Sequence, residues 1–381
     1  MSKSRKSNGE GTLRQRSDGR WEGRYTAPDG RQHSVYARTK TACRDAMRRQ
    51  QAQILTGTWV EPSRLTVGQW LETWLADYCG HLKASSMHSY DLFVHTYFIP
   101  KLGALPLSRL RVIQVQQLFN DLSKHLSVAS LKSLRIVLSS ALSCAVRFEL
   151  LRENPVEKVV LPRPEKRPMT IVDRTQFPAF IAAAQATGCA DALILLLQTG
   201  IRSGELRGLR WSDVDLDART LIVTRQLAFD GSGYRVQSPK SGKSRTLILM
   251  PDTVDLLRRH RARQAADRLA SGGWVDDALS EDLIFRKPTG RPYSRTTLLG
   301  PARRVGEAIG LPELHPHDLR HSYAVAALRS GIDVKTVQNN LGHASAAMTL
   351  DTYAAYTDDM GRAAADKLAA YWSANTGLGS N

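Results

Sequence analysis

Cysteine is scarce in this chain of 381 residues, which has only four. Cys43, Cys79, Cys144 and Cys189 stand far apart and form none of the close pairs that zinc sites and disulfide frameworks use. Neither kind of site is therefore expected. Unpaired cysteines suit a reducing compartment, so we expect a cytoplasmic protein.

Long hydrophobic runs are also missing from the sequence. No apolar stretch is expected to reach the roughly 20 residues that a membrane helix needs. The N-terminus is polar and basic, and no apolar segment follows it as one would in a secretory signal. We therefore predict a protein that is not exported and has no membrane partner.

Acidic residues are fewer than basic ones. The chain has 36 Asp and Glu against 53 Lys and Arg, which gives a formal net charge of +17. Such an excess favours a polyanionic partner, and nucleic acid is the first candidate. Charge alone leaves open a protein that is merely basic.

The segment from His315 to Tyr353 concentrates four histidines, two arginines and two tyrosines. His317 and Arg320 are three residues apart, which places both side chains on one face of a helix. Further along, a glycine is expected to cap a helix in the left-handed conformation, with His343 directly after it. Tyr353 then closes the segment on a further expected helix.

A second fragment, from Thr199 to Leu206, holds Arg202 at the start of an expected helix. The planar fork of arginine binds two phosphate oxygens at once and stabilises the charge that a phosphorane-like transition state gathers there. Two arginines, histidines and a tyrosine, without a carboxylate cluster for a metal, therefore suit chemistry on a phosphodiester. Glu205 is expected to be structural and to orient Arg202.

These residues resemble the signature of the tyrosine recombinase (phage integrase) family, which is Arg, Lys, His-x-x-Arg, His or Trp, and Tyr in that order. The matching positions are Arg202, Lys240, His317-Asp318-Leu319-Arg320, His343 and Tyr353. The similarity in layout covers almost the whole chain. It implies a site-specific DNA recombinase, the integrase of a phage or integrative conjugative element, that needs no metal, ATP or cofactor.

The resemblance implies that Tyr353 is the nucleophile and forms a 3′-phosphotyrosyl link to DNA. Arg202 and Arg320 would bind the two non-bridging oxygens of the scissile phosphate and stabilise its charge. Tyr323 and Tyr356 are the rival tyrosines. Tyr353 is preferred because it has the family's spacing from His343.

The resemblance also assigns the proton transfers. Lys240 would protonate the departing 5′-oxygen as general acid, with Lys243 and Arg245 as neighbouring alternatives. His317 would move the proton of the tyrosine or bond to the phosphate. His343 would hold a phosphate oxygen.

Four histidines in one segment also raise the alternative of a zinc site. No carboxylate or cysteine is spaced to complete such a site, and neighbouring arginines would repel the cation. His315 and His321 are therefore expected to be structural.

Two turn signals, Asp18-Gly19 and Asp29-Gly30, separate short alternating segments and predict a three-stranded antiparallel sheet, followed by a helix from Thr41 to Leu55. Its basic and aromatic side chains fit a sheet that enters a DNA groove; they are Arg14, Arg16, Arg20, Trp21, Arg24 and Arg38. The alternative is a solvated basic sheet with Trp21 in its core. The resemblance implies that residues 1–60 form an N-terminal module that binds arm-type DNA sites.

Residues 64–155 have helical apolar spacing and predict a bundle. The expected helices are Thr66–Cys79, Ser86–Ile99, Val112–Leu122 and Ser127–Phe148, with Thr66, Ser85 or Ser86, and Ser127 as caps. Lys83, Lys132 and Arg135 are candidate phosphate contacts, although a charged helix face is more often only solvated. The resemblance places a helical core-binding (SAM-like) domain here.

Residues 156–169, with several prolines, predict a linker, residues 170–375 a mixed α+β catalytic domain, and residues 376–381 a tail. Ser238–Arg245 is expected to form a basic hairpin between two short strands, with Lys243 as a further candidate DNA contact. The fold class is therefore a multidomain, mainly α protein with small antiparallel β-sheets.

The resemblance also implies partners: double-stranded DNA at attachment sites and separate arm sites, and a homotetramer that exchanges strands through a Holliday junction. An excision factor or a DNA-bending protein is a further candidate partner. The expected location is the cytoplasm of a bacterial host. The alternatives are a resolvase or invertase of the same family, a type IB topoisomerase that reseals the same strand, and a catalytically silent DNA-binding regulator.

Overall fold

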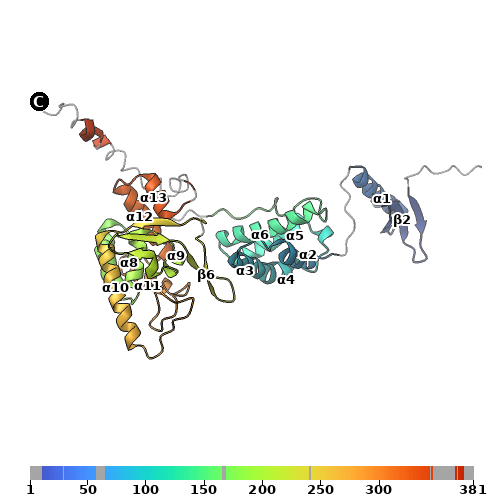
Figure 1. Cartoon of the computed structure of the whole chain (residues 1–381). Coiled ribbons are helices and arrows are strands. Elements are labelled where there is room, and N and C mark those ends of the chain that lie inside the picture. Colours follow the sequence, from blue (N-terminus) through green and yellow to red (C-terminus); the bar gives the residue numbers. More distant parts are fainter. Residues whose placement is uncertain are drawn as a thin grey trace, which may run out of the picture. The chain divides into compact units, whose positions relative to one another are not determined.

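The computed structural model describes residues 11–28, 30–56, 65–164, 169–239, 242–343, 345, 365–366 and 368–372. The chain forms two compact units, Met1–Glu165 and Lys166–Asn381 (Figure 1). Helices dominate, and the strands form small antiparallel sheets. The predicted fold class is therefore confirmed.

A three-stranded antiparallel sheet begins the described chain. Its elements are β1 (Thr12–Gln15), β2 (Trp21–Thr26), β3 (Gln32–Ala37) and the following helix α1 (Lys40–Leu55). The strands pair in the order β1-β2-β3, and α1 covers one face of the sheet (Figure 1). Tyr25 and Met47 are buried between sheet and helix. This agrees with the sheet and helix that the sequence predicts.

A helical bundle follows. Its elements are α2 (Val67–Thr73), η1 (Trp74–Tyr78), α3 (Ala84–Phe93), η2 (Val94–Phe98), α4 (Ile99–Leu102), η3 (Leu107–Arg109), α5 (Val112–Leu122) and α6 (Val128–Arg147), where η denotes a short π- or 3-10-helix. Thr66 and Ser127 cap α2 and α6 with their side chains, as predicted. The predicted serine cap of α3 is wrong. The carbonyl oxygen of Lys83 accepts the first helical bond, from Met87 N at 3.0 Å, so Ser85 and Ser86 already lie inside the first turn.

Helix α6 has 20 residues and is, by length and average composition alone, long and apolar enough to cross a membrane. The prediction that no stretch reaches that length is therefore wrong. Eight of its residues, Leu131, Leu138 and Leu142 among them, are buried in the core of the bundle. This core position accounts for the apolar composition of the helix.

The core of the bundle continues past residue 155. Val156 and Val159 are buried in it. The backbone N–H and carbonyl oxygen of Val160 both bond to the side-chain amide of Gln116, each at 2.9 Å. The first residues of the expected linker therefore pack on the bundle.

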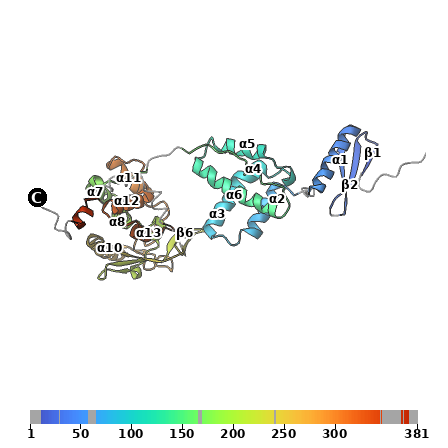
Figure 2. The same ribbon diagram turned by 90° about the horizontal axis from the view of Figure 1, so that it is seen from above.

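The second unit is mixed α+β. Its elements are η4 (Arg174–Gln176), α7 (Phe177–Gln185), α8 (Ala190–Thr199), α9 (Ser203–Arg207), η5 (Trp211–Asp213), β4 (Val214–Asp215), β5 (Thr220–Val223), β6 (Gln226–Phe229), β7 (Tyr234–Gln237), β8 (Arg245–Ile248), α10 (Pro251–Ala270), α11 (Leu299–Ala308), α12 (Pro316–Arg329) and α13 (Val334–Leu341). Helix α8 packs against α7, α10 and α12 (Figure 2). Leu193, Leu195 and Leu196 of this helix are completely buried.

Two small sheets share the second unit, one in the order β4-β5-β8 and one formed by β6 and β7. Because β7 pairs with β6 and β8 pairs with β5, the basic stretch Ser238–Arg245 links two sheets and is not the predicted hairpin. The predicted strand from Thr220 to Gln226 divides after Val223. At this break Arg225 pairs with the buried carboxylate of Asp213, and the chain changes sheet.

Candidate active site

The C-terminal end of helix α13 gathers three arginine side chains on three successive carbonyl oxygens. The pairs are Arg245 Nε with Asn340 O (2.7 Å), Arg320 Nη2 with Leu341 O (2.7 Å) and Arg202 Nη2 with Gly342 O (3.2 Å). The last carbonyls of a helix have no partner within it and carry the negative end of its dipole, so they attract cations. Positions as far as 140 residues apart in the chain therefore meet at one point.

Gly342 ends α13 in the left-handed conformation that the sequence predicts, with φ of 64°. A Cβ at this position would lie 3.1 Å from Nη1 of Arg245, so only glycine leaves the arginine undisturbed. His343 follows directly, and its backbone N–H bonds to Gln338 O at 3.1 Å. The glycine cap thus positions the side chains of Arg245 and His343.

Glu205 lies completely buried beside these arginines. Arg245 donates Nη1 and Nη2 to its two carboxylate oxygens at 3.0 and 2.6 Å. Arg202 donates Nη1 at 3.0 Å and its backbone N–H at 2.9 Å. Burial alone would raise the pKa of Glu205, but the hydrogen bonds and charges of Arg245 and Arg202 lower it. The ionised carboxylate thus fixes both guanidiniums, and the part of Arg245 was not predicted from the sequence.

The local sequence explains why Arg202 starts helix α9. Gly200 ends α8 with φ of 64°, and the chain turns there. A Cβ on Gly200 would lie 2.4 Å from a ring carbon of Tyr323, so this position has no room for a side chain. The turn leaves Arg202 at the N-cap, and Glu205 in the third helical position reaches back to its N–H.

Arg320 is 2 % exposed, the most buried of the three arginines at this point. Its Nη1 donates to Gly200 O at 2.8 Å, and its Nη2 donates to Leu341 O. A buried guanidinium needs such partners, because an unpaired buried charge is costly. Arg320 therefore joins the turn after α8 to the end of α13.

The predicted histidines take different environments. His343 is half-buried, and burial together with the charges of Arg320 and Arg202 lowers its pKa to about 4. Its ring is therefore neutral at pH 7. His317 is exposed in the first turn of α12, and its ring meets the ring of His321 edge-on with centroids 4.8 Å apart. Burial and the charge of Arg320 lower the pKa of His321, against the opposing effect of a nearby aspartate.

His321 had been expected to be structural, yet it contributes to the electrostatics of His343. Its place four residues after His317 was the one signal in the sequence that could have indicated this position. His315 is the N-cap residue of α12, and its backbone N–H donates to the carboxylate of Asp318 at 2.8 Å.

One of the rival tyrosines, Tyr323, lies among the residues that the structure describes. Tyr323 accepts a hydrogen bond on its hydroxyl from Asn340 Nδ2 at 2.9 Å, and burial raises its pKa. A phenol held in this way is a poor nucleophile. Tyr353 and its rival Tyr356, like Lys240, lie outside the described residues.

The predicted DNA contacts of the N-terminal sheet divide between its two faces. Arg14 and Arg24 lie on the face away from α1, on either side of Glu22. Trp21 and Gly23 are two residues apart on β2, so they face the same side of the sheet. A Cβ on Gly23 would touch Cys43 of α1, so this is the side that faces the helix. Trp21 is half-buried there. It therefore does not share the face of the two arginines.

Several of the predicted contacts have a partner within the same module. The Lys40 ammonium lies 5.3 Å from the ring centroid of Trp21, and the guanidinium of Arg16 lies 5.4 Å from that of Tyr36. Arg20 bonds to Asp18 at 2.8 Å. The remaining predicted contacts Arg38, Lys83, Lys132 and Lys243 are exposed, and Arg135 is half-buried on α6.

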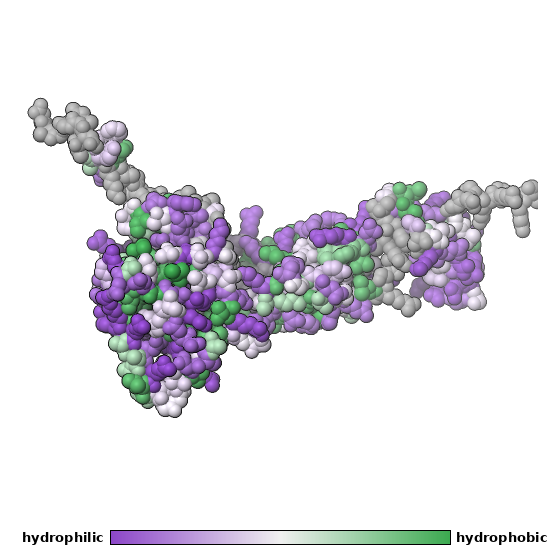
Figure 3. Space-filling view, viewed as in Figure 1, coloured by the Kyte–Doolittle hydropathy of each residue, from purple (hydrophilic) through white to green (hydrophobic). Residues whose placement is uncertain are grey.

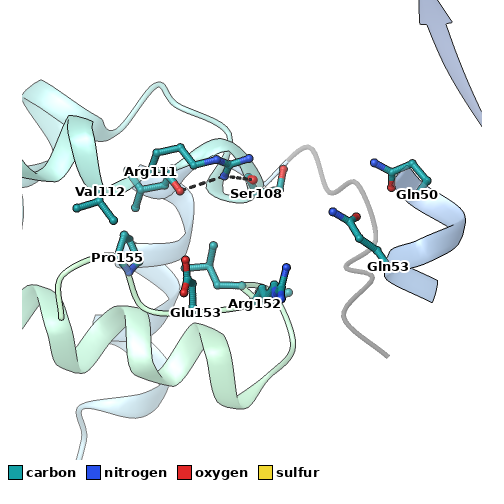
Figure 4. A pocket seen from close by; sticks show the side chains of 11 residues that line it. Gln50, Gln53, Ser108, Arg111, Val112, Arg152, Glu153 and Pro155 are labelled. Atoms are coloured by element: carbon teal, nitrogen blue, oxygen red, sulfur yellow. Dashed lines mark hydrogen bonds between the residues drawn. The ribbon is translucent and has the colours of Figure 1, made fainter. Parts of the chain in front are cut away.

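A hollow in the first unit lies apart from these groups. Ser108, Arg111, Arg152 and Pro155 line it on the side of the bundle (Figure 4). Arg111 donates Nη1 to the Ser108 carbonyl oxygen at 3.0 Å. None of the predicted site residues lines this hollow, so it is not the candidate active site.

Two family models match the chain in the regions just described. The model of the phage integrase family matches residues 171–360, and that of the phage integrase N-terminal SAM-like domain matches residues 66–123. Together these matches cover more than half of the chain. The chain belongs to the phage integrase family. The resemblance predicted from the motif is thus confirmed, and with it a tyrosine recombinase, an enzyme that breaks and rejoins DNA strands.

Relatives of the family extend the match beyond the second unit. A tyrosine recombinase XerC-like protein of Caldanaerobacter subterraneus subsp. tengcongensis is 27 % identical over 319 residues, which are 79 % of this chain and 82 % of the relative. An integrase of Streptomyces ambofaciens is 26 % identical over 324 residues, 83 % of each chain. The solved Tn1549 transposon integrase, in complex with a circular intermediate DNA, superposes with a TM-score of 0.69 at 23 % identity, covering 80 % of this chain and 99 % of that one. This last likeness shows that the integrase fold is shared.

Proposed function

We propose that this chain is a site-specific integrase that cuts and rejoins double-stranded DNA to insert and excise a mobile element. The convergence of Arg202, Arg320 and His343 at the end of α13 carries this proposal. Guanidinium forks suit the non-bridging oxygens of a phosphodiester, and a preorganised pair stabilises the charge of its transition state. Integrases among the relatives support the choice of a mobile element.

In this reaction Tyr353 attacks the scissile phosphorus, and the bond from phosphorus to the 5′-oxygen breaks. The 3′ end of the cut strand becomes esterified to the tyrosine, and a 5′-hydroxyl is released. Arg202 and Arg320 bind the two non-bridging oxygens, and Lys240 gives the leaving oxygen its proton. The phosphotyrosyl ester keeps the energy of the broken bond, so rejoining needs no ATP, metal or cofactor.

The histidines complete the proton transfers. A phenol with a pKa near 10 needs nearby positive charge to ionise at neutral pH, and the arginines supply it. His317, exposed on the first turn of α12, takes the proton of the tyrosine or bonds to the phosphate. His343 is neutral at pH 7, so it donates a hydrogen bond to a phosphate oxygen without adding charge.

We also propose the division of labour along the chain. Residues 1–60 bind arm-type DNA sites, residues 64–155 bind the core site, and residues 170–375 carry out catalysis, with residues 156–169 between them. Four protomers pair two duplexes and exchange strands through a Holliday junction. The reaction takes place in the cytoplasm of a bacterial host, with an excision factor or a DNA-bending protein as a candidate further partner.

A suicide-substrate assay tests the proposal. The wild-type chain and the Tyr353→Phe and Tyr356→Phe variants are incubated, without divalent metal, with nicked duplexes from the ends of the element that carries the gene. The wild type and Tyr356→Phe should form a covalent protein–DNA band, and Tyr353→Phe should not. A band that survives in Tyr353→Phe but disappears in Tyr356→Phe would move the nucleophile to Tyr356.

The rival functions give different products. Transfer of the cut strand to a second duplex distinguishes a recombinase from a type IB topoisomerase, which reseals the same strand. Inversion or resolution of a circle without integration would identify an invertase or resolvase. Specific binding without any covalent band for the wild type would favour the silent regulator.

A further inference from the structure

The N-terminal sheet has one face that α1 does not cover, and a buried carboxylate lies in that face. Glu22 is in the central strand β2, and its side chain is only 3 % exposed. The strand register places Arg14 and Tyr36 directly beside it on the two neighbouring strands. In Figure 3 the visible surface around these strands is mostly hydrophilic. A buried acid in such a surface needs an explanation.

Four side chains donate hydrogen bonds to this carboxylate. The Nε atom of Arg14 bonds to Oε2 at 2.5 Å, and the Nε atom of Arg24 bonds to Oε1 at 3.1 Å. The hydroxyls of Ser34 and Tyr36 bond to Oε1 at 3.0 and 3.4 Å. The bond from Arg14 outweighs the effect of burial and lowers the pKa of Glu22 to about 2, so the group is ionised.

Both arginines bond to Glu22 through their own Nε atom. Because each is held through Nε, the plane of its guanidinium is fixed while the terminal nitrogens Nη1 and Nη2 remain at the outer end of the side chain. The side chains of Arg14 and Arg24 are 58 % and 39 % exposed. A guanidinium already held in place loses less freedom when it binds a further partner.

Double-stranded DNA fits this face best. The two terminal nitrogens of a guanidinium match O6 and N7 of guanine, and the major groove of B-DNA admits a β-ribbon. Double-stranded RNA has a major groove too deep and narrow for such a reading. The guanidinium of Arg16 and the half-exposed ring of Tyr36, which lie against each other, extend the same surface.

We propose that Glu22 is a positioning residue that presents Arg14 and Arg24 as two fixed forks to guanine edges in the major groove of double-stranded DNA. This inference rests on the proposed DNA binding of residues 1–60. It adds a role for an acidic residue on a surface that binds a polyanion. Glu22 does not touch the DNA itself and acts through the two arginines.

The change in DNA affinity on removing the charge of Glu22 distinguishes a positioning role from a purely electrostatic one. If only charge mattered, removing a negative group from a DNA-facing surface would strengthen binding. If Glu22 positions the arginines, Glu22→Gln removes the charge-assisted hydrogen bonds and releases both forks, so binding weakens. The substitution keeps the size and shape of the side chain, so the sheet has no new cavity or clash.

The test uses the full chain with Tyr353→Phe, so that no covalent adduct forms. Random 20-bp duplexes are selected on this protein and on the same protein with Arg14→Ala and Arg24→Ala. Sequences that the chain with both arginines enriches, and the chain without them does not, are the DNA sites that the sheet binds. Their affinity is then measured for Glu22→Gln, Glu22→Asp and the control Asp45→Asn, which removes one negative charge from the exposed side of α1.

We expect sheet sites rich in guanine, an affinity loss of about tenfold for Glu22→Gln, and a smaller loss for Glu22→Asp, which keeps the charge but shortens the side chain. Asp45→Asn should bind as the parent does or slightly more tightly. Amide hydrogen exchange of β2 confirms in each variant that the sheet is folded; if Glu22→Gln does not fold, Glu22→Asp decides the outcome.

Three results would overturn the inference. They are tighter binding by Glu22→Gln, the absence of any sequence whose enrichment depends on Arg14 and Arg24, and equal competition by duplex RNA of the same sequences. The proposed recombinase activity fails in a different way. It is read from the covalent band on nicked attachment sites in the chain that retains both Tyr353 and Glu22.

Discussion

The guanidinium of Arg245 forms two hydrogen bonds, of 3.0 and 2.6 Å, with the buried carboxylate of Glu205. Arg202 shares the same carboxylate from the start of α9, whereas Arg245 is the first residue of β8. One acid therefore fixes two cations that come from different elements. Such preorganisation lets fixed charges act on a phosphate without first being reordered.

Removing this acid should destabilise the second unit strongly. Glu205→Gln leaves two largely buried guanidiniums without their counter-charge, and breaking a buried pair in this way costs about 3–5 kcal/mol. Urea unfolding of the full chain measures the change. The control is Asp217→Asn, whose carboxylate pairs with Arg258 but is 96 % exposed, so that its loss should cost less than about 1 kcal/mol. Equal costs for the two variants would contradict the assignment.

The same carboxylate predicts a dependence of stability on pH. The pKa of Glu205 is lower in the folded protein than its ordinary value of 4.5, so the unfolded chain binds the proton more readily. Its stabilisation is therefore complete above pH 4.5 and is lost as the pH falls through the folded value. Between pH 7 and pH 3 the wild type should lose more unfolding free energy than Glu205→Gln. Parallel losses would show that other groups dominate the acid response.

Local features of this network were predictable from the sequence. The glycine cap at Gly342, the helix start at Arg202 and the orienting part of Glu205 all depend on residues close together in the chain. Helix and strand periods, turns and caps are local in the same sense. They therefore predicted the fold class, whereas Arg202 and Arg320 were singled out by the chemistry of their residue type and by the order of the motif.

Long-range pairings could not be predicted in this way. Arg245 lies 40 residues from Glu205, and no local pattern links them. The pairing of β8 with β5 in place of β7 likewise depends on tertiary packing, which is why the expected basic hairpin was wrong. The spacing of His321 from His317 places both on one face of α12, but the approach of His321 to His343 follows from the docking of α13 on α12, which no local pattern predicts.

Two glycines test the close packing behind Arg202. Gly200 and Gly188 both have positive φ, 64° and 68°, so Ala at either position carries the same cost of about 1 kcal/mol for a left-handed backbone. A Cβ at Gly200 would also meet Tyr323 at 2.4 Å and Leu341 at 2.9 Å, whereas at Gly188 nothing lies within 4 Å.

Gly200→Ala should therefore cost about 1–3 kcal/mol more than Gly188→Ala, which overpacking explains. It should also lower the cleavage rate, because Gly200 O holds Arg320. Thermal unfolding and the suicide-substrate assay measure the two effects. Similar behaviour of both variants would mean that Tyr323 moves aside without strain.

His343 should titrate near pH 4 in the free protein. Burial and the charges of Arg320 and Arg202 lower its pKa to about 4, so the folded state resists the proton that the unfolded chain accepts below pH 6.5. A phosphate bound between the two arginines cancels their charge. The pKa should therefore rise when attachment-site DNA binds to the Tyr353→Phe chain. Nitrogen-15 NMR of the imidazole measures both values, and an unchanged pKa on DNA would place the phosphate elsewhere.

Arg207 offers a case in which stability and activity should change in opposite directions. It is 7 % exposed, and burial lowers its pKa. Within the part of the chain that the structure describes, its Nη1 has no hydrogen-bond partner. Its guanidinium lies 5.6 Å from the ring centroid of Tyr234 on β7. Because an unpaired buried charge is unfavourable, Arg207→Met should raise the free energy of unfolding by about 1 kcal/mol.

The same substitution should slow strand cleavage. The cation–π contact with Tyr234 helps to hold β7, which ends at Gln237, three residues before the proposed general acid Lys240 in the sequence. If Lys240 is displaced, a substrate whose leaving 5′-oxygen is replaced by sulfur should restore the rate, because a thiolate leaves without being protonated. The control is Arg261→Met, which removes an exposed guanidinium 5.3 Å from the ring of Trp211 and should change neither property. A slow variant that sulfur does not rescue would mean that Arg207 acts on the phosphate or on the fold, and not through Lys240.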